Sequence, residues 1–115
     1  MPIKQLKVTI KNNDETRVFK TKGVKTENSI KYVEEDNTKI IYFIKEKSLV
    51  RETHDLKMDL LFSKEKGTIH YKKINNTYEI PIKTKQINVT DNSIYIEYLI
   101  DNNEFNYRIE EILWV

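Results

Sequence analysis

The sequence predicts an all-β protein, and three observations support that prediction. The 115 residues contain no Ala, the best helix former, but they contain 16 Ile, 7 Val and 10 Thr, whose β-branched side chains favour strands. Pairs of Asn and Asp recur along the chain, and they suit tight turns. The segments between them, mostly about 8–12 residues long, alternate apolar and polar residues. This layout is typical of an antiparallel sandwich or barrel, and the length predicts one domain, residues 1–115.

Composition also excludes several classes of protein. Two isolated Gly cannot form a phosphate-binding loop, and a chain without Cys has no disulfide and no Cys-based zinc site. No segment approaches the about 18 apolar residues that cross a bilayer, so no membrane association is expected. Residues 1–7 lack the apolar segment of a signal peptide, which makes the cytoplasm the simplest expected location. The net charge of +2 gives little attraction for nucleic acid.

The N-terminal half is expected to contain two hairpins. A three-residue turn at 12–14 would pair Val8 with Val18. The first 25 residues of the chain carry a net charge of +5, so this first hairpin is basic. The second turn is expected at residues 36–37, where Asp and Asn follow each other. The strand that returns from it, residues 40–44, is apolar on both faces. It is therefore either well covered or the site of an exposed apolar patch.

Residues 47–62 fit two patterns. A helical stripe would consist of Leu49, Thr53, Leu56 and Leu60. The alternation from Lys57 to Phe62 fits a strand better, so strands are predicted for this segment.

Three consecutive hairpins are predicted in the C-terminal half. Two-residue turns at 75–76, 91–92 and 102–103 would place Ile80 opposite Tyr71, Val89 opposite Ile94, and Tyr98 opposite Tyr107. The inward positions are even-numbered at Ile80 and Ile82 but odd-numbered at Ile87 and Val89. A strand changes phase in this way at a β-bulge, which is therefore expected within residues 83–86.

The same registers place four tyrosines on the inward side of the sheet. They are Tyr71, Tyr78, Tyr98 and Tyr107. Packing in the core would explain them, with each hydroxyl finding a partner or reaching the mouth of a barrel. Alternatively, they line a cavity, since a small barrel has room for one small ligand. On that interpretation they are the predicted ligand-binding residues.

The residue types of catalytic and metal sites do not converge in the sequence. His54 and His70 are the only histidines, and a metal site needs several ligands. The acidic residues at 34–36 are neighbours along the chain, and Glu34 is expected to meet Lys39 across the turn. We therefore predict no catalytic residue, no metal and no cofactor.

The order of features from Met58 onward resembles the YwiB-like uncharacterised bacterial family. The features are Leu60-Leu61-Phe62, a charged turn ending in Gly67, Tyr71, Ile80-Pro81-Ile82-Lys83-Thr84, and the Tyr-rich segment 94–100. Residues 72–76 depart from that family, which has a Thr-Pro-Tyr-Gly-like turn there. The resemblance implies a closed up-and-down barrel of eight to ten strands with calycin- or lipocalin-like architecture, and it implies no activity.

Two functions follow as hypotheses. The first is a non-enzymatic cytoplasmic barrel that binds a small apolar or amphipathic ligand. The second is a protein–protein interaction module in a cytoplasmic assembly, which the apolar segment 40–44 and the basic first hairpin favour. An enzyme ranks third, and nucleic acid is not an expected partner. Because the chain has no Ala and only two Gly, its inward positions carry bulky groups, which favours a filled interior.

Overall fold

The alternation of apolar and polar residues builds strands along nearly the whole chain. The computed structural model describes residues 3–34 and 36–112. Their elements are β1 (Ile3–Asn12), β2 (Glu15–Lys25), β3 (Ser29–Val33), β4 (Lys39–Phe43), β5 (Ser48–Glu52), β6 (Leu56–Leu61), the 3₁₀ turn η1 (Phe62–Lys64), β7 (Lys66–Tyr71), β8 (Asn76–Val89), β9 (Ser93–Ile100) and β10 (Asn103–Ile112). The predicted strands in residues 47–62 are confirmed, because β5 and β6 occupy that segment.

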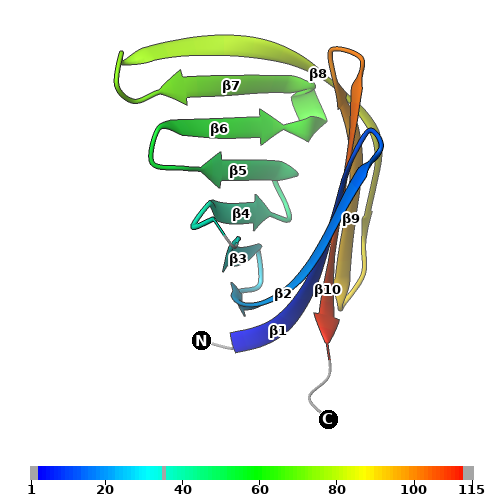
Figure 1. The fold of residues 1–115 in the computed structure, drawn as a ribbon. Coiled ribbons are helices and arrows are strands. Elements are labelled where there is room, and N and C mark those ends of the chain that lie inside the picture. Colours follow the sequence, from blue (N-terminus) through cyan, green and yellow to red (C-terminus); the bar gives the residue numbers. More distant parts are fainter. Residues whose placement is uncertain (1–2, 35, 113–115) are drawn as a thin grey trace.

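Each strand pairs in antiparallel fashion with the next one along the chain, and β1 pairs with β10 to close the sheet. The described residues thus form a ten-stranded up-and-down barrel, which confirms the predicted fold class. Figure 1 shows two layers of strands at a steep angle, with β3 to β7 in one and β1, β2, β9 and β10 in the other. β2 and β3 share only three paired positions, Gly23 to Lys25, where the layers meet.

Strand β8 belongs to both layers. It pairs first with β7 and then with β9, and Figure 1 shows it crossing above β7 and bending down beside β9. Thr84 pairs with Tyr98 and Gln86 with Glu97, so the register shifts between these positions. The predicted β-bulge within 83–86 is confirmed. It lets Ile82 and Ile87 face the same interior although one position is even and the other odd.

Asn and Asp provide the left-handed backbone of several turns. The φ angles are 54° at Asn13, 66° at Asn37, 52° at Asn75 and 55° at Asp101, whereas neither Gly has a positive φ. These side chains tolerate that conformation better than most. Gly23 serves another purpose. A Cβ at this position would lie 2.8 Å from the Lys31 carbonyl oxygen, so Gly permits the close approach of β2 and β3.

The register of one hairpin was predicted correctly and that of a second was not. Around residues 91–92, Val89 pairs with Ile94, as expected. At the β9–β10 turn, Asp101 rather than Asn102 is the first turn residue, so Ile100 pairs with Asn103. Tyr98 consequently lies opposite Phe105 and not opposite Tyr107, although all three keep the predicted face.

Two further registers were predicted wrongly. Residues 72–75 form a four-residue connection, and Ile80 pairs with Gly67 rather than Tyr71. The Lys72 amide ends β7 by donating to the Asp55 carbonyl oxygen at 2.9 Å. In the first hairpin, Asn12 pairs with Glu15, so Val8 lies opposite Phe19 and not opposite Val18. This register buries the larger side chain of Phe19 in place of that of Val18.

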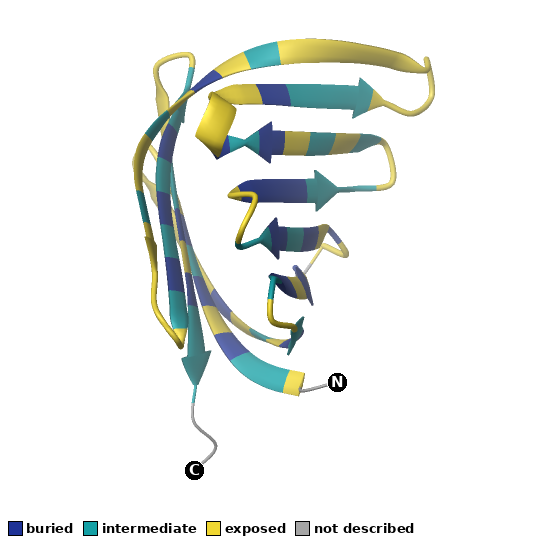
Figure 2. Ribbon diagram, turned by 180° about the vertical axis from the view of Figure 1, so that it is seen from behind, coloured by how far each residue is buried: buried dark blue, intermediate teal, exposed yellow. Residues whose placement is uncertain are grey.

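Bulky side chains fill most of the interior, and Figure 2 shows buried positions alternating with less buried ones along β9 and β4. The core cluster comprises Leu6, Val8, Ile10, Phe19, Ile30, Tyr32, Ile40, Tyr42, Leu49, Leu60, Phe62, Ile82, Ile94, Ile96, Tyr98, Tyr107 and Ile109. The interior is not filled completely, because a pocket remains between the tips of the β1–β2 and β9–β10 hairpins and the strands β5 and β6.

Candidate functional site

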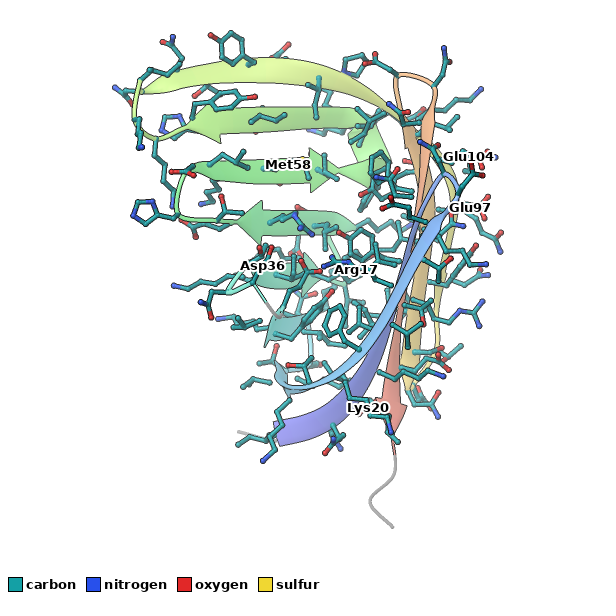
Figure 3. The ribbon with its side chains drawn as sticks, viewed as in Figure 1. Arg17, Lys20, Asp36, Met58, Glu97 and Glu104 are labelled. Atoms are coloured by element: carbon teal, nitrogen blue, oxygen red, sulfur yellow. The ribbon has the colours of Figure 1, made fainter. Side chains whose placement is uncertain are left out.

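The pocket lies at one mouth of the barrel. Its volume is about 310 Å³, and residues of both layers line it. They are Ile10, Asn12, Glu15, Arg17, Arg51, Met58, Tyr98, Ile100, Phe105 and Tyr107. Figure 3 shows two of them, Arg17 from β2 and Met58 from β6, which come from opposite layers. We call this space the mouth pocket.

Charged side chains form the polar end of the mouth pocket. Glu34 follows β3 directly, and its side chain is 0% exposed. The Arg51 Nη1 atom lies 2.9 Å from Glu34 Oε1, and Arg17 Nη2 lies 3.6 Å from Glu34 Oε2. Arg51 Nη1 also donates a hydrogen bond to the Tyr107 hydroxyl at 2.8 Å. Four side chains from β2, β5, β10 and the β3–β4 connection therefore meet here.

Burial, and to a lesser extent the neighbouring charges, shift the pKa values of several groups at this end. Burial raises the pKa of Glu34, and Arg51 opposes that rise more strongly than Arg17 does. Burial likewise raises the pKa of the Tyr107 and Tyr32 hydroxyls. Both Glu34 oxygens and the Tyr32 hydroxyl are buried without an aligned hydrogen bond among the described residues. The Glu34 contacts are thus ion pairs whose hydrogen-bond geometry is imperfect.

Aromatic rings form one wall of the mouth pocket. The Tyr98 ring stacks on Phe105 with centroids 5.4 Å apart and on Tyr107 with centroids 6.5 Å apart. Phe62 packs against Tyr98 with ring centroids 5.1 Å apart and a tilted ring. Aromatic rings that stack and pack at an angle in this way restrict one another's movement. The wall is therefore preformed.

The structure separates the four predicted ligand-binding tyrosines into two pairs. Tyr98 and Tyr107 line the mouth pocket and are 1% and 4% exposed. Tyr71 and Tyr78 lie outside it and are 39% and 50% exposed. The register gives Tyr78 the face of Ile69 and Met58, but of these three residues Met58 alone lines the pocket. The rings of Tyr71 and Tyr78 pack edge to face at 5.7 Å.

Sequence reasoning missed the charged cluster. It placed Glu34 opposite Lys39 across the turn, but Glu34 bonds the backbone of Thr38 and turns its side chain inward. A signal was present in the alternation. Glu34 lies two residues after Tyr32 and therefore shares its inward face. By the same spacing of two residues, Arg51 shares the inward face of Leu49, and Arg17 shares that of Phe19. Three charged residues at inward positions indicate pairing in the interior.

The outer face of β4 to β6 carries a second feature. Ile40 and Tyr42 point inward, so Ile41 and Phe43 lie on the outside and are partly exposed. Phe43 and Leu61 line an open groove of about 580 Å³ together with Glu46, Ser48, Asp59, Lys66, Gly67 and Thr68. The apolar segment 40–44 therefore contributes to the core and also to an outer groove.

The two histidines lie apart. The His54 side chain is 94% exposed, and His70 shares a 2.8 Å hydrogen bond with Thr77. Within residues 3–34 and 36–112, no three His, Asp or Glu side chains are grouped as a metal site requires. Nor does this part of the chain contain a helix of the length and apolar character needed to cross a bilayer.

The fold and the mouth pocket define a class: a small up-and-down β-barrel with a largely filled interior and a charged, partly apolar pocket at one mouth. Comparison with protein-family models, with curated proteins and with solved structures finds no match for the chain.

Proposed function

We propose that this protein is a non-enzymatic binding barrel that holds a small amphipathic ligand in its mouth pocket. One observation carries the proposal: a pocket of about 310 Å³ in which apolar walls end at two arginines. Binding sites for small molecules are typically concave, mostly apolar and equipped with a few polar groups that orient the ligand. A calycin-like family relationship and a cytoplasmic location belong to the same proposal, and the sequence features from Met58 onward support the first of them.

A pair of variants at neighbouring positions tests the proposal. Ile100 lines the mouth pocket, whereas Leu99 lies on the opposite face of β9. The Ile100→Trp substitution fills the pocket, and Leu99→Trp adds the same ring outside it. Titration with a fluorescent amphipathic dye should show binding to the wild type and to Leu99→Trp, with at least tenfold weaker binding to Ile100→Trp. Absence of binding to the wild type, or equal binding to both variants, contradicts the proposal.

The outer groove supports a second candidate, a protein–protein interaction module. Contiguous apolar surface that is exposed on a small protein often marks a site for a partner. Ile41 and Phe43 supply such surface beside the groove, and Val33 is 46% exposed nearby. Pull-down and sizing experiments should detect a complex that Ile41→Lys abolishes and that Lys31→Gln, at the paired position on β3, preserves. If sizing finds only a monomer and the pull-down finds no partner that Ile41→Lys loses, these results count against this function.

A further inference from the structure

The polar end of the mouth pocket has more hydrogen-bond donors than the protein uses. A guanidinium group carries five N–H donors. Arg51 donates to the Tyr107 hydroxyl and faces Glu34, while the contacts of the Arg17 guanidinium are the 3.6 Å ion pair with Glu34 and the Phe19 ring at 5.9 Å. Most donors of the two guanidiniums therefore have no acceptor among the described residues.

Charge and depth favour an anion at this place. The charged residues of the lining are Arg17, Arg51 and Glu15, which together carry a formal charge of +1, and the buried Glu34 brings the total to zero. Glu34 is 0% exposed and is not part of the pocket lining, whereas both arginines and the Tyr107 hydroxyl belong to residues that line it. A group that reaches the polar end of the pocket meets the two guanidiniums before it meets the Glu34 carboxylate. A carboxylate at this place can accept charge-assisted hydrogen bonds from the two guanidiniums, whereas a cation would face two like charges.

The geometry of Arg17 fits such an exchange of partners. Its side chain is 50% exposed, and its distance of 3.6 Å to Glu34 exceeds that of a good hydrogen bond. Arg51 is 23% exposed and held by Tyr107, so Glu34 keeps its nearer cation when Arg17 turns to a ligand. The intrinsic carboxylate thus holds the arginines in position without occupying all of their donors.

We propose that the mouth pocket binds a monocarboxylate with a short aliphatic chain. The carboxylate pairs with Arg17 and Arg51, and the chain lies against Ile10, Met58, Ile100 and Phe105. The volume of about 310 Å³ equals that of roughly ten water-sized groups at about 30 Å³ each, which sets the ligand at about ten non-hydrogen atoms. Octanoate has this size. This inference rests on the proposed binding function and specifies the headgroup.

The test compares three probes of equal chain length on the intact protein: octanoate, octanol and octylammonium. Calorimetric titration of the wild type should give affinities at least tenfold higher for octanoate than for octanol, and the weakest binding for octylammonium. Arg17→Gln should lower the octanoate affinity about tenfold and leave the octanol affinity unchanged. Lys11→Gln removes a charge from the exposed end of the same hairpin and should change neither affinity. Thermal melting shows whether each variant is folded.

The outcomes separate the two proposals. If octanol binds the wild type as tightly as octanoate, or if Arg17→Gln weakens both probes equally, the carboxylate site is overturned while the binding barrel stands. If no probe binds the folded wild type, both are overturned. Should Arg17→Gln fail to fold, Arg17→Lys keeps the charge but loses the two-pronged donor geometry, and an octanoate affinity that stays at the wild-type level would contradict the site.

Discussion

Replacing Arg51 by Met removes the nearer of the two cations that face the buried Glu34 carboxylate. Breaking a buried ion pair by removing one partner typically costs about 3–5 kcal/mol, because the other charge stays buried. Arg51 is 23% exposed and Arg17 remains at 3.6 Å, so we expect the lower end of that range, about 3 kcal/mol. For an m-value of about 2 kcal/mol/M, the urea midpoint should fall by about 1.5 M.

The loss should also depend on pH. Burial raises the pKa of Glu34, and Arg51 is the strongest influence that lowers it, so the variant has a still higher pKa at Glu34. A carboxyl with a raised pKa contributes stability that is complete below its unfolded-state pKa and is lost as the pH rises through the folded-state pKa. Urea unfolding should therefore show a larger deficit for Arg51→Met at pH 8 than at pH 5.

Two further variants are the controls for this prediction. Arg51→Met/Glu34→Leu removes both charges and should recover at least half of the lost stability. Arg108→Met removes an exposed arginine that packs over the Tyr95 ring and should cost no more than about 1 kcal/mol. A midpoint for Arg51→Met equal to that of the wild type at pH 8, or a deficit that is the same at both pH values, would refute the reasoning.

Three other changes have defined outcomes. Gly23→Ala places a Cβ 2.8 Å from the Lys31 carbonyl oxygen and should cost about 1–3 kcal/mol in urea unfolding; an unchanged midpoint argues against the close approach. Deletion of Lys85 removes the extra residue of the bulge, so Thr84 and Gln86 become neighbours on a regular ladder and Ile87 keeps its inward face; the loss of stability should stay below the about 1.5–3 kcal/mol that exposing Ile87 would cost, and a larger loss would contradict this. Burial raises the pKa of Tyr42 to about 12, so the stabilising effect of its neutral hydroxyl is complete below about pH 10 and lost as the pH rises through about 12. In an ultraviolet titration, Tyr42→Phe should lose a phase at high pH. Loss of a phase at lower pH would contradict this prediction.

Strand positions and the bulge could be predicted because alternation is a local property. The even positions up to Ile82 and the odd ones from Ile87 require a phase change wherever the strand runs. The exact register of a hairpin is less local. It depends on which of several Asn and Asp residues adopts positive φ, and Asp101 does so where the pattern favoured the pair after it. A shift by two residues preserves the face of every side chain, so the alternation does not reveal it.

Alternation places the three charged residues of the cluster inward, but which of them pair could not be predicted, for a different reason. An inward Glu34 is unfavourable by itself and becomes acceptable only beside Arg51 and Arg17, which lie 17 residues away in each direction. Such pairing depends on the closed barrel, which brings β2, β5 and the end of β3 together. The tyrosines illustrate the same limit, since register assigned a face to Tyr78 but not its exposure.

The pairing of β1 with β10 determines when the barrel is completed during synthesis. Gln5 pairs with Ile112, so the seam joins residues more than 100 positions apart. Before β10 leaves the ribosome, β1 to β9 are at most an open sheet whose edge strands, β1 and β9, present unpaired backbone groups. Such edges attract other chains. The barrel therefore closes only after translation of β10, and a chain truncated before β10 should associate with other copies instead of forming a smaller barrel.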